Sequence, residues 1–381
     1  MGILDKNGMK RVESIYLTLL RAGLWDEKGR VEGDIDWKGL MALAKRQSTT
    51  ALICHAALQL EGNVVPAALQ PKMQAFLLKT INAHASTNRA IASIVTRLHE
   101  QGIDAVLLKG QGVASYYPTP LLRQCGDIDL YVGKENYEAA CNLLKAADAP
   151  DSIHPQSTTQ IAVQGSSDAT DKHTEFDLGG GLSLEIHEYT EVLDDAKLNT
   201  YYQTISDAGT KVDLSSIVFD GVRVPTPEDT FNAFYIFHHL WHHTIGLGMG
   251  LRQVCDWAVF LRTHAGRLDE ERLKTYLITL GLLDEWQVYG CLAVQHLGLK
   301  AEEMPFYDVK KNRRAQRLLQ YILAEGDNRD FKFGRSEQPT QKKAATLRYI
   351  FRKTARLLSI FPRQAVKYFA HSILSGIRKN L

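Results

Sequence analysis

The chain has 381 residues, of which 45% are hydrophobic and 23% charged. This is enough apolar material for about two or three domains, each with its own core. The counts of Gly (28), Pro (11) and Cys (5) exclude a collagen, a low-complexity disordered protein and a disulfide-rich scaffold. The five cysteines include no Cys-x-x-Cys pair, so a reducing compartment fits best. No secretory signal pattern and no run of 18 apolar residues is visible, and we expect a cytoplasmic protein.

The charge is unevenly distributed along the chain. The total is only +2, but residues 340–381 hold ten Lys or Arg and no Asp or Glu, which leaves −8 for residues 1–339. Apolar residues alternate with the basic ones in this tail, so a helix packed on the acidic body is the favoured interpretation. A helix lying on an anionic membrane surface is the alternative. Sequence-specific nucleic-acid binding is not expected, since no recognised motif is present.

Hydrophobic periodicity divides the chain into four regions. Residues 1–101 read as helices, with Asp36 as the N-cap of one of them. Residues 102–225 form an α+β core, residues 226–339 return to helices, and residues 340–381 form the basic helical tail. The predicted fold class is therefore α+β, a small mixed-sheet core flanked by N-terminal and C-terminal helical regions.

Within the core, strands are predicted at five places and helices at two. The predicted strands are Ile103–Leu108, Asp127–Val132, Gln160–Val163, His173–Asp177 and Leu182–Tyr189. The predicted helices are Val113–Tyr117 and Glu135–Ala147, and the three glycines Gly179, Gly180 and Gly181 are typical of a hairpin turn.

The segment Gly126-Asp127-Ile128-Asp129-Leu130 contains the first candidate catalytic residues. Residues two apart on a strand share a face, so Asp127 and Asp129 project together while the apolar residues between them face the core. Two neighbouring carboxylates repel each other, and such a pair suits a hard cation such as Mg²⁺. Glu185 in Leu184-Glu185-Ile186-His187 supplies a third carboxylate by the same alternation, with Asp177 and Glu188 as competing candidates.

Together with Leu107-Leu108-Lys109-Gly110 and Arg123, these motifs resemble the uncharacterised bacterial nucleotidyltransferase family of the DNA polymerase beta-type superfamily. The resemblance implies that Asp127, Asp129 and Glu185 are catalytic and bind two Mg²⁺ ions. It also implies that Lys109, Gly110 and Arg123 contact a nucleoside triphosphate. His187 is expected to hydrogen-bond a metal ligand rather than to bind metal. The wider superfamily has Gly-Ser where this chain has Lys109-Gly110, so a positive charge replaces a hydroxyl.

Two other patterns are weaker. Gly33-Asp34-Ile35-Asp36 repeats the same letters, but it follows no strand and runs into a helix, so we interpret it as a helix cap. His238, His239, His242 and His243 have i,i+4 spacing, but they lack a nearby third ligand, which makes a zinc site the minor alternative.

The motifs predict a Mg²⁺-dependent transfer of a nucleoside monophosphate from a nucleoside triphosphate to an acceptor hydroxyl, with release of pyrophosphate. The acceptor is not identified by any residue. The altered Lys109-Gly110 turn supports a second hypothesis, a catalytically silent nucleotide-binding or scaffold protein. The basic tail alone motivates a third, a membrane-peripheral interaction protein.

Overall fold

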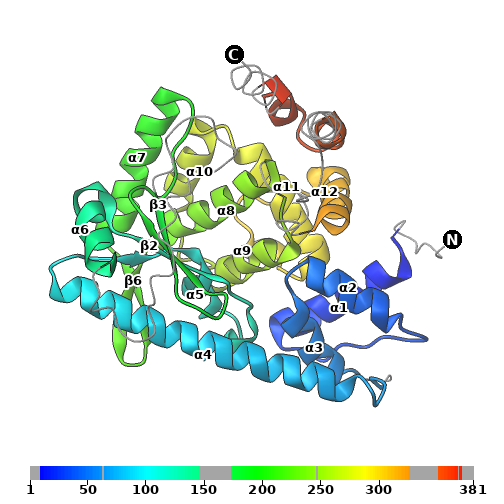
Figure 1. Cartoon of the computed structure of the whole chain (residues 1–381). Coiled ribbons are helices and arrows are strands. Elements are labelled where there is room, and N and C mark those ends of the chain that lie inside the picture. Colours follow the sequence, from blue (N-terminus) through cyan, green and yellow to red (C-terminus); the bar gives the residue numbers. More distant parts are fainter. Residues whose placement is uncertain are drawn as a thin grey trace, which may run out of the picture. The chain divides into compact units, whose positions relative to one another are not determined.

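The computed structural model of the chain describes residues 9–61, 64–145, 173–245, 248–326, 351–367 and 369–370. Its contacts divide it into two compact units, and Figure 1 labels their helices and strands. The sheet unit comprises Pro66–Ile236 and Arg267–Leu280, and the helical unit comprises Met1–Val65, Phe237–Gly266 and Gly281–Leu381. The predicted α+β class is confirmed. The four predicted regions do not coincide with these units, and their boundaries stay a prediction.

The sheet unit is built on a four-stranded mixed sheet in the order β1-β2-β4-β3. The strands are β1 (Val106–Leu107), β2 (Asp127–Tyr131), β3 (His173–Asp177) and β4 (Ser183–His187). β2 and β4 run parallel, while β1 pairs antiparallel with β2, and β3 pairs antiparallel with β4. A parallel central pair requires a long crossover connection, so its two strands come from distant parts of the sequence.

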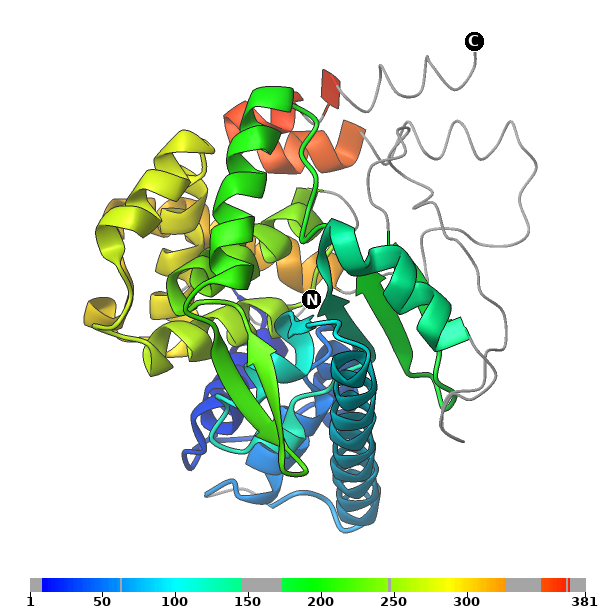
Figure 2. The same cartoon turned by 90° about the vertical axis from the view of Figure 1, so that its left-hand side faces the viewer.

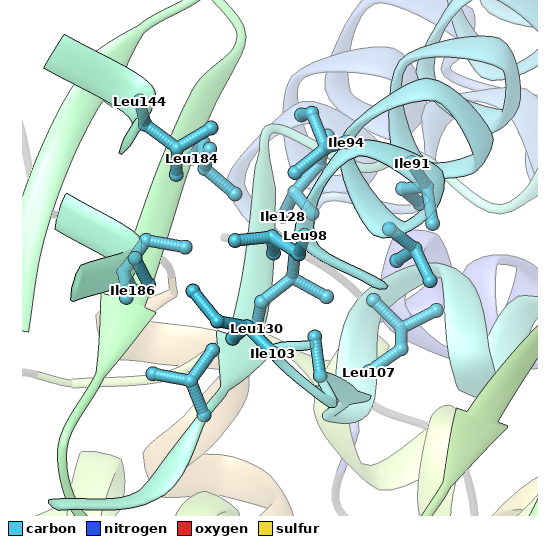
Figure 3. Packing of buried hydrophobic residues seen from close by; sticks show 14 of the residues in the cluster. Ile91, Ile94, Leu98, Ile103, Leu107, Ile128, Leu130, Leu144, Leu184 and Ile186 are labelled. Atoms are coloured by element: carbon cyan, nitrogen blue, oxygen red, sulfur yellow. The ribbon is translucent and has the colours of Figure 1, made fainter. Parts of the chain in front are cut away.

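One face of this sheet is apolar and covered by helices α4 (Gln70–Glu100) and α6 (Gly133–Lys145). Ile128 and Leu130 of β2 and Leu184 and Ile186 of β4 point into this core, as the alternation predicts (Figure 3). The helices contribute further apolar side chains to the same cluster, among them Ile91, Ile94, Leu98, Ala140 and Leu144. Since the core takes alternate residues, the residues between them are left on the opposite face.

The hairpin between β3 and β4 is turned by Gly179, Gly180 and Gly181, all with positive φ, which confirms the predicted turn. Leu178 donates its backbone N–H to Leu182 across it at 2.9 Å. Such a run of left-handed residues is sterically open to glycine and costly for other residues. The turn fixes the register of β3 on β4.

Several elements of the sheet unit differ from the sequence prediction. The first strand is only Val106–Leu107, because the backbone of Ile103 still hydrogen-bonds to Leu98 at the end of α4. The helix expected over Val113–Tyr117 is α5, Lys109–Ala114, which begins directly after the strand. The strand predicted at Gln160–Val163 lies outside the described residues.

Helix α7 (Ala196–Lys211) and the hairpin β5–β6 (Ser215–Phe219 and Val222–Thr226) were not predicted at all. The hairpin forms a separate two-stranded ribbon, and α6 lies alongside the main sheet (Figure 2). Asp195 caps α7 by accepting hydrogen bonds from two backbone N–H groups of the first turn. The remaining elements of the unit are η1 (Pro120–Leu122), α10 (Glu270–Thr279) and the first part of α8 (Asp229–Ile245).

The regular elements of the helical unit are all helices in its described part, apart from an isolated β-bridge between Arg30 and Glu61. Its elements are α1 (Arg11–Trp25), α2 (Trp37–Arg46), α3 (Thr50–Leu58), the rest of α8, α9 (Leu251–Thr263), α11 (Leu283–Leu292), the π-helix η2 (Ala293–Leu297), the short 3₁₀ helices η3 (Ala301–Glu303) and η4 (Val309–Lys311), and α12 (Asn312–Glu325). Asp36 caps α2 by accepting a hydrogen bond from the Gly39 N–H at 2.9 Å, which confirms the predicted cap. No single helix in the described part of the chain is long and apolar enough to cross a membrane.

Two features hold this unit together. Its core is aromatic: Trp257 lies 4.7 Å from Trp286 between ring centroids, and Phe237 lies 5.0 Å from Trp286, both in edge-on geometry. The buried Gln47 side chain joins distant segments, because its amide donates to the Ile322 carbonyl at 3.0 Å and accepts from the Leu251 N–H at 2.9 Å.

The basic tail is described only over residues 351–367 and 369–370, where residues 351–358 and 362–367 are helical. Leu357, Ile360, Phe361 and Ala365 are buried, and the Phe361 ring lies 4.8 Å from Trp241. The packing interpretation is therefore confirmed for this part. The rest of residues 340–381 lies outside the described residues.

Candidate active site

Asp129 and Glu185 lie directly opposite each other on the parallel strands β2 and β4. Both belong to the face of the sheet that the apolar core leaves open, and Asp129 is only 1% exposed. A buried carboxylate is tolerated when positive charge or hydrogen bonds compensate it. Two cationic side chains provide that compensation here.

The first is His187, which follows Glu185 on the same face of β4. Its Nε2 lies 3.0 Å from Asp129 Oδ1 and 3.3 Å from Glu185 Oε2. Burial alone would lower the pKa of His187, but the hydrogen bonds to both carboxylates raise it to about 9. Burial likewise opposes ionisation of Glu185, whereas His187 and Lys109 together lower its pKa to about 2.

The second is Lys109, whose Nζ lies 3.1 Å from Asp129 Oδ1. Burial would lower the pKa of this ammonium group, but the charges of Asp129, Glu185 and Asp127 raise it overall. Lys109 is therefore charged at neutral pH. It contributes to the site as a fixed positive charge that contacts a carboxylate.

The backbone around Lys109 explains how its side chain reaches the sheet. Lys109 has a φ of 23° and Gly110 a φ of 48° with ψ of −120°, while Leu108 donates its N–H to the Asp129 carbonyl at 3.0 Å. A Cβ at Gly110 would meet only ordinary contacts, 3.6 Å from the Asp127 carbonyl and from Cys125 Sγ. Glycine is therefore favoured here by the backbone conformation and not by lack of space.

Asp127 lies on the same face as Asp129, two residues away on β2, and its charge helps to raise the pKa of Lys109. In the described part of the chain, one group of metal-ligand side chains is compact enough to hold an ion, with ligand atoms all within 4.8 Å of one another. That group is Asp129, Glu185 and His187, so it includes His187 in place of Asp127. The metal-binding role of Asp127 stays a prediction.

The competing carboxylates lie elsewhere. Asp177 accepts a hydrogen bond from the Gly179 N–H at 2.8 Å and so belongs to the hairpin turn. Glu188 follows His187 on the chain and is buried outside the group of three ligands. Arg123 is buried near His84 of α4, whose pKa it lowers in addition to the effect of burial. A contact of Arg123 with a nucleotide stays a prediction.

The sequence reasoning missed two members of this face. Glu175 of β3 lies directly opposite Glu185, and His173 lies opposite His187 with the two rings 5.5 Å apart. The alternation of β3 shows that Glu175 and His173 share a face. It does not show which strand β3 pairs with, or in which register. The polar face thus extends across three strands.

The histidine group of α8 is not brought together as a metal site. The His239 and His243 rings touch edge-on at 4.4 Å between centroids, but no compact group of three ligands among the described residues includes them. The minor zinc alternative has no support from the described residues.

A divalent cation fits the donor set around Asp129. Asp129 Oδ2 is buried and accepts no hydrogen bond from the described residues, so one carboxylate oxygen is available to a ligand. Asp129 and Glu185 offer the hard oxygen atoms that Mg²⁺ prefers, whereas the His187 nitrogen is a softer ligand. Lys109 and His187 share the same oxygen, Asp129 Oδ1, so a bound cation would compete with them for that carboxylate.

The family model described as "Uncharacterised nucleotidyltransferase" matches residues 33–298. The chain belongs to this nucleotidyltransferase family. The matched segment contains the Lys109-Gly110 turn, Asp127, Asp129 and the Glu185 strand. Membership supports an enzyme of the nucleotidyltransferase class and leaves its substrates open.

The chain is also similar to a solved structure described as an antigenic nucleotidyltransferase-like protein from Paracoccidioides brasiliensis. That similarity has 13% identity and a TM-score of 0.34, and it covers 58% of this chain and 93% of the other. No curated protein matches this nucleotidyltransferase family member.

Proposed function

We propose that the protein is a Mg²⁺-dependent nucleotidyltransferase that moves a nucleoside monophosphate from a nucleoside triphosphate to an acceptor hydroxyl. The observation that carries the proposal is the opposed pair Asp129 and Glu185, with Lys109 beside it, in a chain of the nucleotidyltransferase family. The proposal includes a bacterial origin, a cytoplasmic location and membership of the DNA polymerase beta-type superfamily.

In the proposed reaction the acceptor oxygen forms a bond to the α-phosphorus, the bond to the β-phosphate oxygen breaks, and pyrophosphate leaves. The hydroxyl proton passes to solvent or to a carboxylate. Asp127, Asp129 and Glu185 would hold two Mg²⁺ ions, which when bound stabilise the attacking and leaving oxygens. The low pKa of Glu185 makes it a weak base, which favours a ligand role over a proton-accepting role.

Lys109 has two roles in this proposal. It neutralises Asp129 when no other cation is near, and its ammonium group supplies positive charge for a phosphate that approaches the sheet. Gly110 and Arg123 are proposed to complete the triphosphate contacts. Positioning and electrostatic stabilisation then account for most of the rate enhancement.

The test is calorimetric titration of ATP, GTP, CTP and UTP into the purified full chain, with and without Mg²⁺, followed by incorporation of α-³²P-labelled nucleotide. We expect Mg²⁺-dependent binding that Asp129→Asn and Glu185→Gln each weaken strongly. Asp104→Asn is the matched control, because Asp104 is an exposed carboxylate of the same unit. Absence of binding by a folded wild-type chain to all four nucleotides contradicts the proposal.

The second candidate is a catalytically silent nucleotide-binding protein. The contact between Lys109 Nζ and Asp129 Oδ1 favours it, since a built-in cation occupies the place of a metal contact. Nucleotide binding without pyrophosphate release or label transfer, for every acceptor class tried, would select this candidate. Release of pyrophosphate that Glu185→Gln abolishes would exclude it.

A further inference from the structure

The helical unit contains a cavity of about 560 Å³ that is separate from the carboxylate site. Its volume is typical of pockets that bind small molecules. Three segments line it, from α1, η2 and the start of α12.

The lining is strongly basic. It contains Arg21, Arg313 and Arg317 and no Asp or Glu. Among the described residues, no carboxylate forms an ion pair with any of the three, and Arg317 donates to a neutral carbonyl, that of Ser359, at 3.0 Å. The three arginines are exposed and all line this cavity, so an anionic ligand in it would meet guanidinium groups that no carboxylate of the described residues neutralises.

One of the lining segments is a π-helix, η2, over Ala293–Leu297. π-Helical turns are rare and occur frequently at functional sites, because the extra residue changes where side chains point. Here the segment presents Gln295 and His296 to the cavity. The His296 Nε2 atom is buried and has no hydrogen-bond partner among the described residues, so it is available to a ligand.

The protonation state of His296 follows from its burial and from the positive charge of Arg21. Burial lowers the pKa of His296, a hydrogen bond with Gln316 opposes that effect, and the positive charge of Arg21 lowers it further. The imidazole is therefore neutral at pH 7 and can accept or donate one hydrogen bond at Nε2, depending on its tautomer. Guanidinium groups supply the charge, and the imidazole and the amides of Gln295 and Gln316 supply directional contacts.

We propose that this cavity binds a small organic phosphate, with Arg21 and Arg313 contacting the phosphate oxygens and His296 and Gln295 contacting the organic part. Guanidinium groups match phosphate geometry through paired hydrogen bonds. The cavity is too large for phosphate alone, and Met9 and Leu17 give it an apolar side for a sugar or similar group. Arg21, Arg313 and Arg317 all lie outside residues 33–298, the segment that matches the family.

The experiment separates this site from the proposed transferase site. Ribose 5-phosphate, pyrophosphate and inorganic phosphate are titrated calorimetrically into the wild-type full chain in EDTA, so that no metal contributes and Lys109 stays paired with Asp129. We expect ribose 5-phosphate to bind more tightly than inorganic phosphate. Adding Arg21→Gln and Arg313→Gln should weaken its binding by about a hundredfold or more, which is the loss expected for two charge-assisted contacts.

The matched control is Lys38→Gln with Lys45→Gln, which removes two positive charges from α2 in the same unit. Circular dichroism checks that each variant is folded. Equal loss of affinity in the control and the arginine variant would overturn the proposal, as would no binding or tightest binding of pyrophosphate. Because the assay contains no metal, its outcome is independent of whether the carboxylate site transfers nucleotides.

Discussion

Lys109 Nζ and Asp129 Oδ1 are 3.1 Å apart, and the aspartate is almost completely buried. The ammonium group therefore offsets part of the free-energy cost of burying this carboxylate in the sheet unit. Removal of one partner of a buried pair leaves an uncompensated charge, whereas replacement of both partners by apolar groups can be nearly neutral. The candidate site thus contributes to stability as well as to chemistry.

We predict that Lys109→Met lowers the free energy of unfolding of the sheet unit by about 3 kcal/mol in metal-free buffer, because Asp129 loses its ammonium partner. Lys109→Arg keeps the charge and should lose much less. Denaturant titration measures both. Mg²⁺ should restore more stability to Lys109→Met than to the wild type, and an equal response in the two proteins would contradict competition between the lysine and a cation.

Glu175 lies opposite Glu185 in the register of β3 and β4. Like charges in directly opposed positions of an antiparallel pair are destabilising. We predict that Glu175→Gln stabilises the metal-free protein by about 0.5 kcal/mol. Thermal unfolding of Glu175→Gln tests this. The control is Glu138→Gln, which removes a charge from the surface of α6. A melting temperature of Glu175→Gln below that of the wild type would refute the prediction.

The buried His84 predicts a loss of stability in acid. Burial and the nearby charge of Arg123 lower its pKa from 6.5 to about 4. The unfolded chain therefore takes up a proton below pH 6.5 that the folded chain accepts only near pH 4, so stability is full above pH 6.5 and falls between these values.

His84→Met should remove this component, since both ring nitrogens of His84 lack hydrogen-bond partners among the described residues. The measurement is the free energy of unfolding of wild type and variant from pH 7 to pH 4. As the pH falls, the free energy of unfolding should decrease less for His84→Met than for the wild type. His99→Gln, an exposed position on the same helix, serves as the control and should follow the wild-type curve.

The described part of the basic tail has an outer side with exposed apolar residues, Phe351, Leu358 and Val366, next to exposed Arg352 and Lys367. We propose that this side binds anionic membrane surfaces. Truncation is a poor test, because it would also remove the buried side chains that pack in the helical unit.

Phe351→Ser with Leu358→Ser is the better variant, since both side chains are exposed. Co-sedimentation with vesicles that contain phosphatidylserine should decrease for this variant. Ala355→Ser, an exposed small residue of the same helix, is the control. Failure of the wild type to sediment with the vesicles at low salt would contradict membrane binding.

The sequence predicted the site correctly where the alternation within one strand determines the face on which a side chain lies. The alternation around Ile128 and Leu130 predicted which face of β2 is apolar, and the same argument selected Glu185 on β4. It could not give the position of Lys109, because that depends on a backbone with positive φ at two successive residues. It also could not pair Glu175 with Glu185, since strand register depends on contacts between distant parts of the chain.

The hydrogen bonds of Gln47 have a consequence for the order in which the protein forms during synthesis. They join a residue near the start of the chain to Leu251 and Ile322, which are 204 and 275 positions away. Domains generally fold as units while the chain emerges from the ribosome. Most of the sheet unit, Pro66–Ile236, is complete before Leu251 has been made. Helices α1, α2 and α3 can already pack on one another, but the surface of α1 that contacts η2 stays uncovered until Leu297 has been made. A ribosome stalled after residue 245 should thus carry N-terminal helices that are bound by chaperones and cleaved readily by protease.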